Sequence, residues 1–84
     1  MVTVKVLGSG CANCKRVEAI VRNVAQKKAY EVEIQKVTEY PDIMKYHIMA
    51  TPGLVINEVV KSAGRIPSDA DISAWMDAAA DHHQ

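Results

Sequence analysis

The 84-residue sequence predicts an α/β fold whose elements follow the order strand, helix, strand, helix, strand, strand, helix. Three observations predict it. β-branched residues alternate with period two at the start, apolar residues then recur at helical spacing, and turn residues separate the later segments. A chain of this length can bury one modest core, so we expect a single domain, residues 1–84, with a four-stranded mixed sheet flanked by three helices.

The first strand and the first helix have the most regular patterns. In residues 2–7 three valines alternate with Thr3, Lys5 and Leu7, which is typical of a strand. From Ala12 to about Lys28 the apolar residues keep helical spacing, and the charged residues fall on the other face.

The middle of the chain predicts a second strand and a short helix. Alternation resumes at Tyr30, and a strand joined to the first strand by a helix favours a right-handed parallel crossover. We expect Thr38 to cap the next helix and Pro41 to lie in its first turn, because proline needs no hydrogen-bond donor there. The apolar side of this helix would carry Ile43, Met44 and Ile48.

The last third predicts a hairpin and a final helix. Residues 54–56 and 59–60 are apolar and flank Asn57-Glu58, which suggests a tight antiparallel turn, and Gly64 would end the hairpin. Ser68 and Asp71 resemble a capping pair for a helix. One face of that helix would carry Ile72, Trp75, Met76 and Ala79.

Charge gives no support for binding to nucleic acid or to membranes, and we expect a cytoplasmic protein. Ten basic and ten acidic side chains cancel, whereas binding to phosphates or anionic lipids requires a basic excess. No segment is long enough to span a bilayer, and the apolar start lacks the basic lead and cleavage site of a signal peptide.

The two cysteines of the chain both lie in Cys11-Ala12-Asn13-Cys14, between the first strand and the first helix. Two intervening residues let the second thiol reach back across a helical turn to the first. Unpaired N–H groups and the positive end of the helix dipole favour the thiolate of Cys11. Cys14 shares a face with Val17 and Val21, so we expect it to be buried and Cys11 to be exposed, which separates attacking from resolving roles.

A structural disulfide is the alternative, non-catalytic explanation of this cysteine pair. A bridge across two residues closes a very small loop and constrains the unfolded chain little. A catalytic dithiol in the cytosol therefore accounts for the spacing better.

Four features together resemble the small thioredoxin-fold redox proteins often called redox-active disulfide protein 2. They are the dithiol, the Thr51-Pro52 pair before the third strand, the Asn57 turn and Gly64, and the resemblance covers nearly the whole chain. It implies a thioredoxin-like fold in which Cys11 attacks a disulfide and Cys14 resolves the mixed disulfide. A cis Pro52 would face the pair, and Thr51 would present its backbone to a partner. The resemblance implies a protein disulfide as substrate, an upstream dithiol reductase, and no cofactor or metal.

Two lysines depart from the pattern of larger thioredoxins. Lys5 stands six residues before Cys11, where those proteins place a buried acid that assists proton transfer. Lys15 and Lys5 could lower the pKa of the thiol, but we expect Lys5 to project into solvent at an end of the sheet. Neither lysine is assigned a catalytic role.

A Cu(I) carrier is the main alternative, because two thiolates suit this soft ion and the motif also resembles the copper loop of heavy-metal-associated domains. Those domains usually carry a methionine shortly before the first cysteine and a strand hairpin after the first helix. Here Gly8-Ser9-Gly10, expected to be a flexible turn, precedes Cys11, and a helix follows the second strand. Redox exchange is therefore favoured over copper carriage and over a noncatalytic interaction module.

The remaining aromatic and sulfur-containing side chains suggest core or surface roles. We expect Trp75, Met44, Met49 and Met76 to fill the core. Tyr40 and Tyr46 are candidates for a partner surface, and His47 is expected at the end of the second helix. The default oligomeric state is a monomer.

Overall fold

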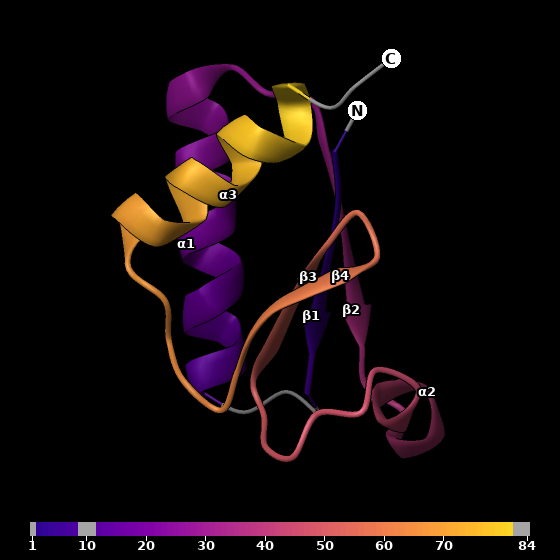
Figure 1. Cartoon of the computed structure of the whole chain (residues 1–84). Coiled ribbons are helices and arrows are strands. Elements are labelled where there is room, and N and C mark those ends of the chain that lie inside the picture. The colour runs from indigo at the N-terminus through magenta and orange to yellow at the C-terminus, as the bar shows by residue number, and fades with distance from the viewer. Residues whose placement is uncertain (1, 9–11, 82–84) are drawn as a thin grey trace.

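The computed structural model describes residues 2–8 and 12–81 of the chain. The observed order of elements is the predicted one (Figure 1). The strands and helices are β1 (Val2–Leu7), α1 (Ala12–Lys28), β2 (Val32–Val37), α2 (Tyr40–Met44), β3 (Gly53–Ile56), β4 (Val59–Ala63) and α3 (Asp69–Asp81).

The strands form one mixed sheet in the spatial order β2-β1-β3-β4. β1 pairs with β2 in parallel, in a register that sets Val4 opposite Ile34. β3 runs antiparallel to β1 and to β4. The predicted α/β class, with a four-stranded mixed sheet and three helices, is therefore confirmed.

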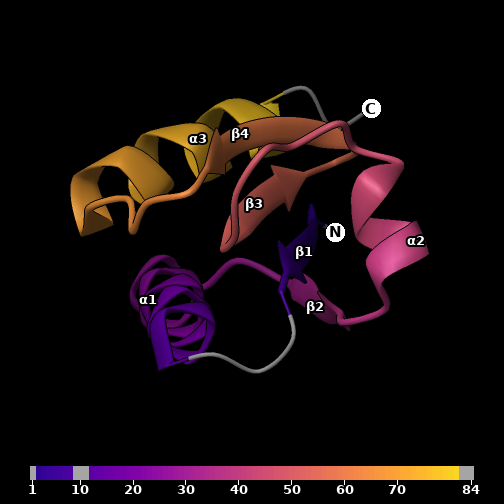
Figure 2. The ribbon, with the colours of Figure 1, turned by 90° about the horizontal axis from the view of Figure 1, so that it is seen from below.

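The helices cover the sheet unequally. α1 and α3 lie against one face and α2 lies against the other, as Figure 2 shows along the plane of the sheet. The main core lies between the sheet and α1 and α3. A smaller cluster on the α2 side consists of Leu7, Ile43, Ile48 and Val55. Alternation along β1 produces this division, because Val4 and Val6 face the main core while Leu7 faces α2.

Two predicted boundaries are wrong. β2 begins at Val32 rather than Tyr30, because Ala29 adopts a left-handed φ of 57° and the Tyr30 N–H donates to the Ala25 carbonyl at 3.0 Å. These two residues therefore finish α1 instead of starting the strand.

α2 is also shorter than predicted. Its N-cap is Glu39 rather than Thr38, without a side-chain cap hydrogen bond, and Pro41 lies in the first turn as expected. The helix ends at Met44, and His47, with φ 59°, lies in the turn beyond it. Ile48 is buried because it packs with the α2-side cluster after the helix has ended.

The predicted hairpin turn and the cap of α3 are confirmed. Asn57 and Glu58 have φ values of 49° and 68°, the left-handed pair that a two-residue type I′ turn requires. Asn57 also joins the turn to β1, because its N–H donates to the Thr3 carbonyl at 2.8 Å and its Oδ1 accepts from the Thr3 N–H at 3.0 Å. At α3 the Ser68 Oγ accepts a hydrogen bond from the Asp71 N–H at 3.1 Å.

Candidate active site at the start of the first helix

Cys14 lies in the first turn of α1, and its side chain is buried, with 5% of the residue exposed. It belongs to the main core together with Val17 and Val21, so the predicted burial of this cysteine is confirmed. The Cys14 sulfur is not a free thiol in the structure. Cys11 lies outside the described residues, and its predicted exposure and attacking role stay predictions.

Gly8, which directly follows β1, brings backbone against the Cys14 sulfur. A Cβ atom built on Gly8 would overlap the Cys14 Sγ, and Gly8 has a φ of 153°. The Gly8 N–H donates to the Val37 carbonyl at 2.9 Å, which fixes this point of the chain to the end of β2. Gly8 is therefore a packing residue, and glycine is needed here because any side chain would displace the sulfur.

The loop before β3 reaches the same point. The Cβ of Thr51 lies 3.6 Å from the position that a Gly8 Cβ would occupy, so Gly8, Cys14 and Thr51 converge. The start of α1, the end of β1 and this loop all lie at one end of the sheet, the lower end in Figure 1. Thr51 is exposed, whereas Pro52 is buried, and the peptide bond between them is cis.

Gly64 holds the other side of this loop. Its N–H donates to the Pro52 carbonyl at 2.9 Å, and its φ of 77° is left-handed. The end of β4 therefore supports the Thr51-Pro52 segment from behind. Of the four site residues predicted from the sequence, the structure brings Cys14 and Thr51 together and sets Pro52 directly behind Thr51.

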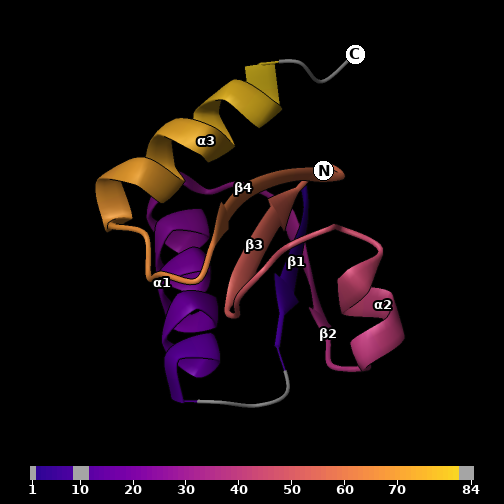
Figure 3. The ribbon, with the colours of Figure 1, turned by 60° about the horizontal axis from the view of Figure 1, so that its bottom comes forward.

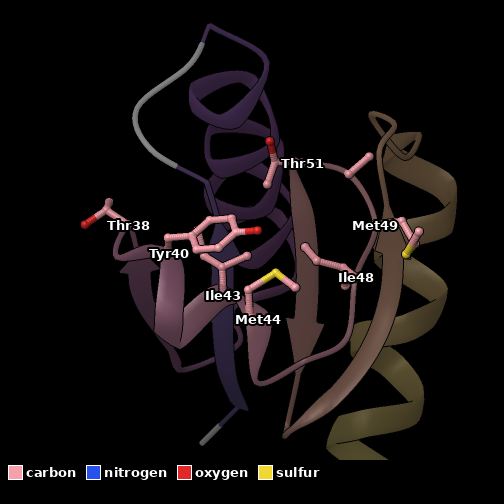
Figure 4. Close-up of a pocket in the computed structure, with 8 residues that line it drawn as sticks. Thr38, Tyr40, Ile43, Met44, Ile48, Met49 and Thr51 are labelled. Carbon is pink, nitrogen blue, oxygen red and sulfur yellow. The ribbon is translucent and has the colours of Figure 1, made fainter.

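An apolar groove of about 480 Å³ starts at Thr51 and extends toward α2 (Figure 4). We call it the α2 groove. The described residues that line it are Thr38, Tyr40, Ile43, Met44, Ile48, Met49, Ala50 and Thr51, none of which is charged.

The α2 groove corrects one prediction. Met44 and Met49 were expected in the core, but they are 42% and 99% exposed, while Met76 is 0% exposed in the main core. Helix α2 is too short to turn both methionines inward, since Met49 falls in the connection after the helix. Tyr40 is 72% exposed and lines the groove. Tyr46 instead forms hydrogen bonds with Lys5 and Glu58.

Lys5 forms a closed polar cluster with Tyr46 and Glu58. Its Nζ donates to the Tyr46 hydroxyl at 2.8 Å and to Glu58 Oε2 at 2.6 Å, and the Tyr46 hydroxyl donates to Glu58 Oε1 at 3.0 Å. Only 20% of the Lys5 side chain is exposed, so the prediction that it projects into solvent is wrong. β1 lies between β2 and β3 rather than at an edge of the sheet. Since Val4 and Val6 face the main core, alternation along β1 directs Lys5 to the opposite face, the α2 side visible in Figure 3.

The cluster keeps Lys5 protonated. The hydrogen bond to Glu58, then that to Tyr46, raises the pKa of Lys5, and the same lysine lowers the pKa of Glu58. Sequence reasoning missed this cluster because Tyr46 and Glu58 stand 41 and 53 residues from Lys5. Lys15, in contrast, is exposed on α1.

The described residues also bear on metal and membrane binding. Within residues 2–8 and 12–81, no three His, Cys, Asp or Glu side chains gather where they could hold a metal ion. None of the helices in this part of the chain has the length and apolar character needed to cross a bilayer.

The fold and the convergence on Cys14 define an α/β protein of the thiol-redox class, and comparison with known proteins identifies its family. A family model described as "Thioredoxin domain" matches residues 2–77. Thioredoxin from Methanothermobacter thermautotrophicus is 31% identical over 72 residues, which cover 86% of this chain and 94% of that protein. Thioredoxin from Methanocaldococcus jannaschii is 31% identical over 72 residues, covering 86% and 83%.

A solved structure supports the fold independently. The crystal structure of the germline-specific thioredoxin Deadhead from Drosophila melanogaster matches with a TM-score of 0.64 and 16% identity, over 92% of this chain and 79% of that one. The chain belongs to the thioredoxin family. At the general level it is a thiol–disulfide oxidoreductase, with protein disulfides as substrates and a reductase as partner.

Proposed function

We propose that this protein exchanges a Cys11–Cys14 dithiol with disulfides of protein substrates. The observation that carries the proposal is the packing of Cys14, which lies buried at the start of α1 against Gly8 and close to the exposed Thr51. A sulfur held in this way cannot reach a bulky substrate itself, but it can act on a neighbouring sulfur. This is the requirement for a resolving cysteine.

The exchange takes place in two displacement steps. The Cys11 thiolate attacks one sulfur of the substrate disulfide, so that a mixed disulfide forms and the other substrate sulfur leaves as a thiolate. Cys14, after losing its proton, attacks the Cys11 sulfur and expels the second substrate thiolate. Two electrons pass to the substrate, two protons restore its thiols, and the Cys11–Cys14 bond closes until the upstream reductase reopens it.

Lys5 takes no part in the proton transfer of this scheme. Its ammonium group is occupied by Glu58 and Tyr46, and its pKa is raised, so it neither accepts the Cys14 proton nor releases one near neutral pH. Larger thioredoxins have a buried acid at the position of Lys5. In this scheme the proton of Cys14 passes instead to water or to the departing substrate thiolate.

Thr51 and the α2 groove supply the substrate contacts. Thr51 is exposed beside the cysteine site, so its backbone is available to an extended substrate segment. Since Thr51 also lines the α2 groove, an apolar side chain of the same segment would enter that groove while the disulfide lies at the cysteines. Pro52, which is buried, would hold the loop that carries Thr51 in place beside the cysteines.

The proposal takes residues 1–84 as one domain that acts as a monomer in the cytoplasm. Reducing conditions there would keep the dithiol supplied with electrons. Size-exclusion chromatography of the reduced protein would test the monomer directly, because a dimer would elute at twice the mass.

Matched cysteine variants test the mechanism. Cys11→Ser should abolish reduction of a peptide disulfide, whereas Cys14→Ser should accumulate a mixed disulfide that is visible by mass spectrometry and released by dithiothreitol. A Cys11→Ser variant with wild-type activity would contradict the assignment, and so would trapping by Cys11→Ser instead of Cys14→Ser.

A further inference from the structure

Two of the methionines in this chain are exposed in the α2 groove. Met49 is 99% exposed and Met44 is 42% exposed, and both line the groove that begins at Thr51. In Figure 4 the Met44 sulfur lies between Ile43 and Ile48, and Met49 stands on the far side of Ile48. The structure thus sets two solvent-accessible thioethers in the apolar surface next to the cysteine site.

A thioether in this position reacts with peroxide. Peroxide transfers one oxygen to the sulfur, so that an S–O bond forms, the O–O bond breaks, the sulfur loses two electrons and the second oxygen leaves as water. The product, methionine sulfoxide, is polar where the thioether was apolar. Met76 provides an internal comparison, because at 0% exposure it is closed to the same reagent.

We propose that Met44 and Met49 form a peroxide-sensitive modification site, and that their conversion to sulfoxides weakens the binding of apolar substrate segments in the α2 groove. The first part depends on exposure alone, and the second rests on the proposed function. The hydroxyls of Thr38, Tyr40 and Thr51 are the side-chain donors that line the groove, and in Figure 4 those of Thr38 and Thr51 point away from the two methionines. A sulfoxide beside Ile43 and Ile48 therefore keeps its water, and that water takes the place of an apolar side chain.

The chemistry also allows the modification to be reversed. Methionine sulfoxide reductases, one for each sulfoxide epimer, return the thioether, with two electrons from a dithiol and two protons, and the oxygen leaves as water. Oxidation of Met44 and Met49 in the disulfide form would thus lower the activity of the protein toward apolar segments and leave the cysteine pair unchanged, because that form has no thiolate for peroxide to oxidise.

The first experiment maps the oxidation. The disulfide form is treated with hydrogen peroxide, quenched with catalase and digested with trypsin. Cleavage after Lys36, Lys45, Lys61 and Arg65 puts Met44, Met49 and Met76 on separate peptides, which are residues 37–45, 46–61 and 66–84. We expect a gain of one oxygen at Met49 first, then at Met44, with Met76 unmodified. Oxidation of Met76 at the rate of Met49 would overturn the proposal.

The second experiment measures the consequence. Treated and untreated protein, both reduced with dithiothreitol, are assayed with two peptide disulfides, one with leucines flanking the cysteine and one with serines. Treatment should raise KM for the leucine peptide about tenfold, which is the effect of a small structural change in an apolar pocket. The kcat for the leucine peptide, and both KM and kcat for the serine peptide, should change little. Repair with both sulfoxide reductases should restore KM.

The Met44→Leu/Met49→Leu variant is the matched control, since leucine preserves the volume but cannot be oxidised by peroxide. Whatever its own KM, peroxide treatment should leave that value unchanged. An unchanged KM in treated wild type, or an equal rise in the double variant, would refute the inference. If untreated wild type turned over neither peptide, the proposed function itself would fail, and the mapping result would still stand separately.

Discussion

Replacing Gly8 with alanine should disrupt the packing around Cys14. The new methyl group would overlap the Cys14 Sγ, and the alanine would have to hold a φ of 153°, a conformation that L side chains rarely adopt. Backbone strain of this kind costs about 1–3 kcal/mol, and overpacking of a buried site costs about 1–3 kcal/mol. The free energy of unfolding should therefore fall by about 2–6 kcal/mol.

That loss is large for a protein of this size. Typical stabilities of about 0.05–0.15 kcal/mol per residue give roughly 4–13 kcal/mol for this chain, so Gly8→Ala should remove a large part of the total. Urea unfolding followed by circular dichroism, in reductant, would measure it. A loss below about 0.5 kcal/mol, the range of neutral surface substitutions, would refute the packing argument.

A double-mutant cycle separates the two contributions. In a Cys14→Ala background the sulfur is gone, so Gly8→Ala should cost only the strain of about 1–3 kcal/mol. Gly64→Ala serves as a second comparison, because it also strains a left-handed φ but its Cβ would meet the exposed Ala50 at 2.9 Å. Equal costs of Gly8→Ala in both backgrounds would show that the Cys14 sulfur does not press on Gly8.

Three further predictions concern stability. Ile72→Ala should cost about 2–5 kcal/mol, because Ile72 is fully buried in the main core, whereas Val59→Ala at an exposed position should change stability by less than about 0.5 kcal/mol in the same urea titration. Ser68→Ala should cost about 1 kcal/mol, measured by thermal unfolding, since it removes the hydrogen bond to the Asp71 N–H. Hydrogen bonds from Tyr30 and then Lys28 hold the pKa of Asp77 below its ordinary 3.8, so the carboxylate stabilises the fold above pH 3.8 and loses this effect as pH falls through the lower folded pKa. Wild type should therefore exceed Asp77→Asn in stability at pH 7 and converge with it at lower pH, and a constant difference across that range would contradict the assignment.

The elements with local signals were predictable from the sequence. The alternation in β1, the apolar face of α1 and the Asn57-Glu58 turn each depend on neighbouring residues, and the structure confirms them. The length of α2 was not predictable in this way. Ile48 has helical spacing from Met44, but its burial comes from packing against Gly53 and the α2-side cluster, which the sequence does not reveal.

The candidate site was predictable only in part. The spacing of Cys14 from Val17 predicted its burial correctly, whereas its proximity to Thr51 depended on a family resemblance, because 37 residues separate the two, from position 14 to position 51. Gly8 stands between the first strand and the dithiol, a position that by itself predicts a flexible turn. In the structure Gly8 is instead needed for packing against the Cys14 sulfur. The Lys5 cluster had no local signal, since its partners come from the turn after α2 and from the hairpin.

A redox titration tests the central claim most directly. The protein is equilibrated in dithiothreitol or glutathione buffers, its free thiols are trapped with an alkylating mass tag, and the experiment is repeated with stoichiometric Cu(I). Exchange chemistry predicts one two-electron transition in the thioredoxin-to-glutaredoxin range, roughly −270 to −200 mV, with both cysteines changing together. Failure to form the intramolecular disulfide, together with tight protection of both thiols by Cu(I), would contradict the account and favour a copper carrier.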